Sequence, residues 1–66
     1  MKPYTPWGVK VRTRLLASGK SISQLADEAS EMTGMYVDSQ YLYKIFTGER
    51  NPQKIIDAVD EILELV

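Results

Sequence analysis

The fold is decided by residues 19–26, GKSISQLA, which end one helix and begin the next. Gly19 is suited to the left-handed conformation that follows the end of a helix. Ser21 and Gln24 have the spacing of a capping box, in which each side chain accepts a hydrogen bond from the backbone N–H of the other residue. We therefore expect one helix to end just before Gly19 and a second to begin at Ile22, with Leu25 on its inward face.

Three more helix starts are visible along the chain. Thr5-Pro6 and Asn51-Pro52 each place an N-cap residue before a proline, which fits the first helical position because its missing N–H would be unpaired there. Asp38 is a further N-cap candidate. No stretch has the alternating pattern of a strand. We expect an all-α, four-helix fold, a single domain over residues 1–66, with helices at about 6–18, 22–32, 39–47 and 52–65.

The composition excludes several function classes. The 66 residues contain no cysteine and no histidine, which removes disulfides, thiol nucleophiles, the commonest general base and the commonest metal ligands. No apolar run approaches the roughly 20 residues that span a bilayer, and the first residues do not resemble a signal peptide. We expect a cytoplasmic protein that is not an enzyme and has no metal, cofactor, small-molecule substrate or membrane partner.

Charge is distributed unevenly along the chain. Residues 1–24 contain five basic and no acidic side chains, whereas residues 25–66 contain nine acidic and three basic ones. One interpretation is a dipolar surface that keeps a small domain soluble. The other, which we favour, is a basic side that faces a polyanion and an acidic side turned away from it.

Two motifs resemble one DNA-binding family. Residues 19–26 and residues 41–52, YLYKIFTGERNP, resemble the second helix and the end of the recognition helix in Cro/repressor-type (XRE) helix-turn-helix domains. The resemblance covers about residues 9–63 and implies a compact, lambda-repressor-like domain. The chain departs from the family in about six extra residues between Ser30 and Val37, which either lengthen the second helix or form a loop over 32–37. It also has Ile22 where many members have a glutamine that contacts the DNA backbone.

The resemblance implies a set of DNA-contacting residues. The reading face of the third helix would consist of Ser39, Gln40, Tyr43 and Lys44. Gln40 can pair with adenine, Lys44 can donate to guanine or phosphate, and Ser39 can do either, whereas Tyr43 could contact a thymine methyl or a phosphate. The candidates for phosphate contacts are Lys10, Arg14, Lys20, Ser21, Ser23 and Arg50. The alternative is that these polar side chains form an ordinary solvated face.

The last predicted helix has a wide apolar arc. Specific DNA sites are usually bound by two-fold dimers, so we assign some apolar side chains of this arc to a homodimer interface, namely Ile56, Leu63, Leu65 and Val66. The alternative is a fuller core with a frayed C-terminal end. Met32 and Met35 are interpreted as gap-filling side chains around the long turn.

The hypothesis favoured by the resemblance is a sequence-specific transcriptional regulator of the phage or mobile-element type, bacterial or phage-encoded, that binds double-stranded DNA. A domain of this size has no room for an effector module, so we expect a repressor that occludes a promoter. The alternative is a helical protein-interaction module, an antirepressor or inhibitor, that has lost DNA binding; the acidic balance, Ile22 and the lengthened turn favour it. An excisionase-like architectural role is a weaker third option.

Overall fold

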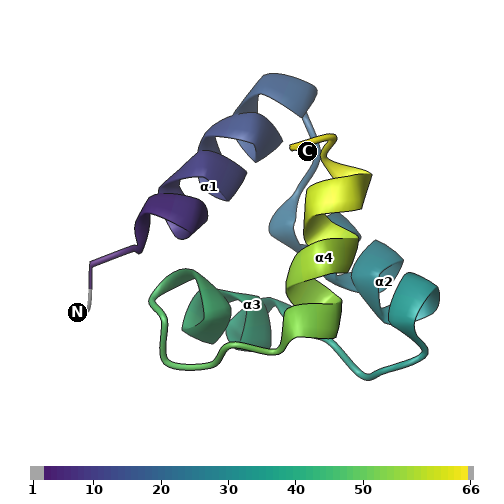
Figure 1. The fold of residues 1–66 in the computed structure, drawn as a ribbon. Helices are drawn as coiled ribbons and strands as arrows, with labels where there is room; N and C mark the ends of the chain where they lie inside the picture. The colour runs from purple at the N-terminus through teal and green to yellow at the C-terminus, as the bar shows by residue number, and fades with distance from the viewer. Residues whose placement is uncertain (1–2, 66) are drawn as a thin grey trace.

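Four helices surround one hydrophobic core in the computed structural model, which describes residues 3–65 (Figure 1). They are α1 (Pro6–Ser18), α2 (Ile22–Thr33), α3 (Ser39–Phe46) and α4 (Gln53–Ile62). Residues 3–65 contain no strand. The predicted all-α class is therefore confirmed, and the first three helices lie within one residue of their predicted ends.

The predicted caps account for where these three helices begin. The Gly8 N–H donates to Thr5 Oγ1 at 3.1 Å. Both bonds of the capping box are present, from the Gln24 N–H to Ser21 Oγ at 3.1 Å and from the Ser21 N–H to Gln24 Oε1 at 2.9 Å. Asp38 accepts from the Tyr41 N–H at 2.8 Å. Local side-chain chemistry thus satisfies donors that helix starts leave unpaired.

Helix α4 differs from its prediction at both ends. Pro52, not Asn51, occupies the N-cap position, and no side chain caps the helix there. The helix ends at Ile62 instead of residue 65, because Glu64 adopts the left-handed conformation with φ 55°. The Leu65 N–H then donates to the Asp60 carbonyl at 2.8 Å and the Glu64 N–H to the Glu61 carbonyl at 3.2 Å. These two bonds are those of a Schellman motif, which turns the chain back toward the core.

The long connection between α2 and α3 combines both predicted alternatives. Helix α2 continues past Ser30 to Thr33, and Gly34, with φ 72°, ends it. Residues 34–38 then form a loop. The Ser30 hydroxyl donates to the Met35 carbonyl at 2.6 Å, and the Met35 N–H donates to Thr33 Oγ1 at 3.2 Å. The extra residues are therefore held by their own hydrogen bonds.

The core lies mainly between α2 and α4, which make the most extensive contacts (Figure 1). Apolar side chains from all four helices and from the loop before α3 bury themselves there, the largest being Phe46, Leu25, Leu42, Ile55, Val11 and Val59. Trp7 packs against the edge of this core, and its indole N–H donates to Asp60 Oδ1 at 2.7 Å, which links α1 to α4. Within residues 3–65, none of the helices is both long and apolar enough to cross a membrane.

Helix α1 begins on the carboxyl end of α3. The Phe46 carbonyl accepts two hydrogen bonds from Thr5, from its backbone N–H at 2.8 Å and from Oγ1 at 3.0 Å. Gly8 is buried at this junction and has no room for a side chain, because a Cβ atom there would lie 2.5 Å from the Phe46 carbonyl oxygen. The relative position of α1 and α3 therefore depends on this glycine.

Candidate functional site

The outer face of α3 carries the predicted reading residues. The inner face buries Leu42, Ile45 and Phe46. On the opposite face Gln40, Tyr43 and Lys44 are exposed, and Ser39 beside the N-cap is half-buried. Positions 40, 43 and 44 have the i, i+3, i+4 spacing that gathers side chains on one stripe of a helix. The structure therefore presents these three side chains to the outside as one polar ridge.

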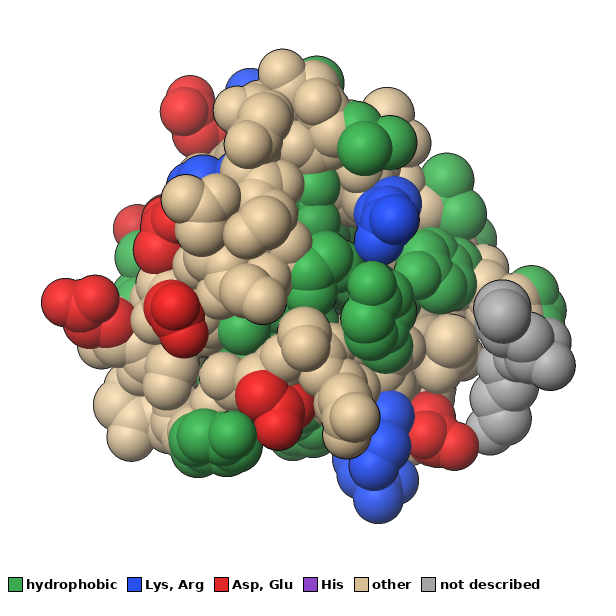
Figure 2. Space-filling model, turned by 180° about the vertical axis from the view of Figure 1, so that it is seen from behind, with side chains coloured by type: hydrophobic (Ala, Val, Ile, Leu, Met, Phe, Trp, Pro, Cys, Tyr) green, Lys and Arg blue, Asp and Glu red, His purple; other side chains and the backbone are tan. Residues whose placement is uncertain are grey.

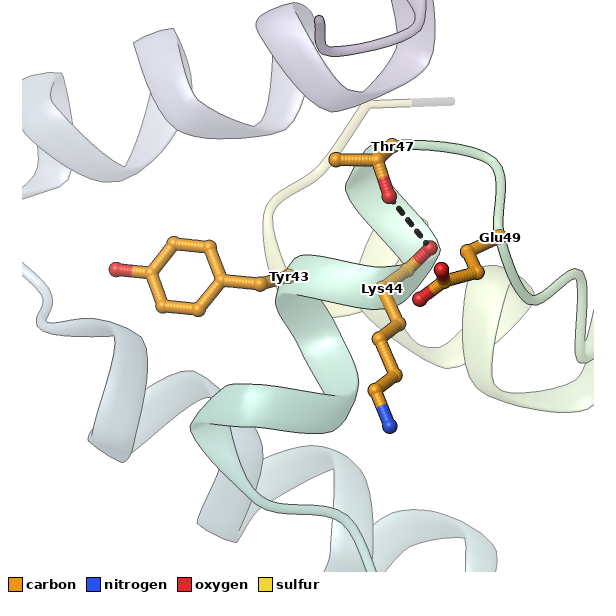
Figure 3. A pocket seen from close by; sticks show the side chains of 4 residues that line it. All are labelled: Tyr43, Lys44, Thr47 and Glu49. Carbon is orange, nitrogen blue, oxygen red and sulfur yellow. Dashed lines mark hydrogen bonds between the residues drawn. The ribbon is translucent and has the colours of Figure 1, made fainter. Parts of the chain in front are cut away.

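Tyr43 is held in a defined position on this ridge. It is 40% exposed, yet its ring meets Phe46 edge-on, with the ring centroids 6.0 Å apart and an interplanar angle of 86°. Its phenol points away from α3 toward the space between α1 and α2 (Figure 3). An edge-to-face contact of this kind favours one ring orientation. Tyr43 can therefore serve as a fixed contact surface between α3 and the neighbouring helices.

Lys44 lies in a shallow hollow with an acidic neighbour. Tyr43, Lys44, Thr47 and Glu49 line this hollow, which has a volume of about 280 Å³ (Figure 3). The Lys44 carbonyl accepts from the N–H groups of Glu49 at 2.9 Å and Arg50 at 3.2 Å, so the chain after α3 folds back beside the lysine. The Glu49 carboxylate reduces the positive potential that Lys44 offers to a phosphate. This part of the ridge is less basic than the sequence alone indicated.

A second hollow lies between α1, the start of α2 and α3. It has a volume of about 210 Å³, and its lining includes Tyr43 from α3 with Lys20 and Ser21, two predicted phosphate contacts. Lys20 is already engaged, because its Nζ lies 2.9 Å from Glu28 Oε1. Arg12 also lines this hollow, although sequence reasoning did not select it. The structure thus brings three predicted site residues together around one hollow, Tyr43, Lys20 and Ser21. Arg12, which was not predicted, lines the same hollow.

The other predicted phosphate contacts are dispersed. Arg14 lies against the carboxyl end of α4, where its Nε donates to the Leu63 carbonyl at 3.0 Å. Lys10 is exposed on α1, one turn before Arg14. At 100° per residue, both lie on the opposite side of α1 from Arg12. Ser23 is exposed in the first turn of α2, and Arg50 is exposed after α3.

A sequence signal for Arg12 was present and was missed. Pairing Lys10 with Arg14 followed the i, i+4 rule for neighbouring charges on a helix. Arg12 instead belongs to the stripe formed by Val9, Arg12 and Leu16, whose spacing of three and four residues also places them on one face. Because Val9 and Leu16 are apolar, this stripe indicated a contact surface with the Arg12 guanidinium in its middle.

Burial at the end of α4 corrects one residue of the predicted homodimer interface. Leu63 is only 3% exposed and belongs to the core, so it is not available to a partner. Ile56 and Leu65 are partly buried and pack against the same core, and Val66 lies outside the described residues. Fewer apolar side chains than predicted are free at this end of α4, because the turn at Glu64 returns the following chain to the core instead of extending the helix.

The large exposed apolar side chains lie elsewhere. Among residues 3–65 they are found on α1, at the end of α2, in the loop after it and on α3, namely Val9, Leu16, Met32, Met35, Tyr36 and Tyr43. Met32 and Met35, expected to fill gaps, are instead 51% and 41% exposed. The loop over 34–38 keeps its own hydrogen bonds, so it does not need these side chains as internal filling.

Comparison with protein-family models, with curated proteins and with solved structures finds no match for this chain. Function must therefore be argued from the chain's own residues. Within residues 3–65, acidic side chains do not assemble into a group of three that could hold a metal ion. The two surface features that could bind a partner are the α3 ridge and the hollow between α1, α2 and α3.

Proposed function

We propose that the chain is a sequence-specific DNA-binding protein that inserts α3 into the major groove. The observation that carries this proposal is the ridge of Gln40, Tyr43 and Lys44, which α3 exposes while its opposite face is buried. The major groove is about 12 Å wide, which is close to the ~10–12 Å diameter of a helix with its side chains. The N-terminal half of such a helix reaches base edges.

The ridge residues have distinct roles in this proposal. Gln40 pairs bidentately with adenine, and Lys44 donates to guanine or to a phosphate at the groove edge. Tyr43 contacts a thymine methyl group or a phosphate. Ser39 is half-buried at the first position of α3. Its proposed contact, with a base or a phosphate, is therefore limited to DNA that lies next to the start of the helix.

Phosphate contacts come from the start of α2 and from the loop after α3. The Lys20 ammonium must leave Glu28 to reach a phosphate. Breaking this ion pair requires little free energy, because the two side chains are 26% and 44% exposed. Ion pairs with such exposure contribute only about 0–1 kcal/mol. Arg50 supplies a second cation at the other end of α3. A duplex occupied in this way at a promoter would be closed to polymerase, so the proposed regulation is repression by occlusion.

Selection of bound sequences from random duplex DNA tests this proposal. The expected result is a consensus sequence, together with binding that weakens as salt rises, by a slope of about −0.9 in log affinity per phosphate neutralised. Two half-sites in the consensus would show that two copies bind, and one half-site would show a monomer. Failure to select any duplex at low salt would refute the proposal.

A pair of double variants identifies the reading helix. Gln40→Ala with Lys44→Ala should weaken specific binding at least about 30-fold, because each good base contact is worth about 1–3 kcal/mol. The matched control is Gln53→Ala with Lys54→Ala, which removes the same residue types from the exposed start of α4. Equal losses for both pairs would show that only non-specific charge was removed.

The alternative function, a protein-interaction module without DNA binding, is favoured by Glu49 beside Lys44 and by the exposed apolar side chains of α1 and the α2–α3 connection. The same selection distinguishes the two functions, because a module of this kind would yield no consensus duplex.

A further inference from the structure

The hollow between α1, the start of α2 and α3 has apolar walls and a basic rim. Leu15, Leu16 and Ile22 line it together with Tyr43. Its basic side chains are Arg12 and Lys20, of which Lys20 is paired with Glu28. Leu16 is 75% exposed, and Val9, on the same stripe of α1, is 53% exposed. The face shown in Figure 2 carries hydrophobic side chains gathered around its middle with a basic side chain set among them. Single exposed apolar residues are ordinary, whereas contiguous ones mark an interaction site.

Arg12 indicates which charge an occupant would carry. It is half-buried at the edge of this hollow, and no acidic side chain in residues 3–65 forms an ion pair with it. A guanidinium in partly apolar surroundings binds a carboxylate well, because two parallel N–H groups match its two oxygens. The positive end of the α2 dipole, at Ser21, adds to the same potential.

The size and the lining of the hollow favour a protein segment. A volume of about 210 Å³ is smaller than the roughly 300 Å³ at which small-molecule sites begin, so it suits one inserted side chain. Leu16 and Ile22 offer nothing to the phosphates or sugars of a nucleic acid, but they suit the apolar face of an amphipathic helix. The positive charge of Arg12 and the apolar lining of the hollow together match a partner segment that is both acidic and amphipathic.

We propose that this hollow binds an acidic amphipathic segment of another protein. One large apolar side chain of that segment enters between Leu16, Ile22 and Tyr43, and a carboxylate one helical turn away pairs with Arg12. This binding goes beyond the proposed function and does not depend on it. A bound segment covers Tyr43, Lys20 and Ser21, so in a DNA-binding protein it would also compete with the duplex.

Peptide display on the full chain tests the proposal. Random 12-residue peptides selected for binding should be enriched in a large apolar residue with Asp or Glu three or four positions away. Leu16→Ser should weaken binding of a selected peptide about 10-fold or more. Its side chain is largely exposed, so the fold should persist, and unchanged thermal unfolding confirms this. The matched control, Met32→Ser, removes another exposed apolar side chain, 51% exposed at the far end of α2, and should change nothing.

A charge exchange tests the role of Arg12 separately. Arg12→Glu should abolish binding of the acidic peptide. The same variant should bind a version of the peptide in which Lys replaces the acid. The control, Lys54→Glu on α4, should show neither change. The proposal is overturned if no peptide is enriched, if the enriched peptides are basic, or if binding is insensitive to Leu16→Ser. A selected DNA duplex whose affinity falls with Leu16→Ser while no peptide binds would assign the hollow to nucleic acid instead.

Discussion

Replacing Gly8 with alanine tests the junction that positions α1 on α3. An alanine Cβ would lie 2.5 Å from the Phe46 carbonyl oxygen and 3.0 Å from its Cα and Cβ atoms. Ordinary contact begins near 3.4 Å, so the two helices must separate by about 0.9 Å. The same oxygen accepts both hydrogen bonds from Thr5, which would lengthen as the helices move apart.

The expected change in stability is the difference between two effects. In an exposed helix, alanine is better than glycine by about 1 kcal/mol. Here, overpacking costs about 1–3 kcal/mol, and each weakened hydrogen bond costs up to about 0.5–1.5 kcal/mol. The net prediction for Gly8→Ala is a loss of about 1–3 kcal/mol in the free energy of unfolding. For a domain of this size, each kcal/mol lowers Tm by about 4–8 °C.

Thermal and urea unfolding, followed by far-UV circular dichroism, measure this loss. The matched control is Thr13→Ala, which improves helix propensity at an exposed position of the same helix and should leave stability unchanged or slightly higher. If Gly8→Ala were as stable as the unmodified chain, α1 and α3 would not approach as closely as described. The hollow lined by Arg12 and Tyr43 would then lose its structural basis, because those residues lie on the same two helices.

Two further predictions concern α4. Glu64→Gly should raise the free energy of unfolding by about 0.5–1 kcal/mol. Glycine adopts φ 55° without the steric cost of ~1–2 kcal/mol that other residues have there, and its greater entropy loss on folding cancels part of this gain. Glu64→Gln is the control, and an equal gain there would attribute the effect to charge at the helix end. Asp60→Ala should lower stability by about 1–3 kcal/mol and shift the fluorescence of Trp7, the only tryptophan, to longer wavelength, because the indole N–H loses its acceptor. Asp60→Asn, which keeps an oxygen acceptor, should lose less; equal stability of Asp60→Ala and the unmodified chain would contradict this role.

The polar ridge of α3 was predictable because it depends on the period of one helix. Asp38 sets where α3 begins, and the apolar positions Leu42, Ile45 and Phe46 determine which side turns inward. Once both are known, Gln40 and Lys44 can only lie outside. The acid beside Lys44 was not predicted. Its position depends on the turn at Gly48, φ 82°, after which the N–H groups of Glu49 and Arg50 both donate to the Lys44 carbonyl.

The sequence by itself determined the helical class, the starts of α1, α2 and α3 and the inward faces of the helices. These features depend on interactions between residues three or four apart, such as the bond between Thr5 and Gly8, which form in any chain with the same local order. Only the tertiary structure decided that Arg12 rather than Arg14 shares a hollow with Tyr43, that Leu63 belongs to the core, and that Gly8 must lack a side chain. Each of these depends on contacts between residues distant along the chain, as between Thr5 and Phe46, 41 positions apart. Local periodicity does not encode how two helices approach each other, because that distance is set by the packing of the whole core.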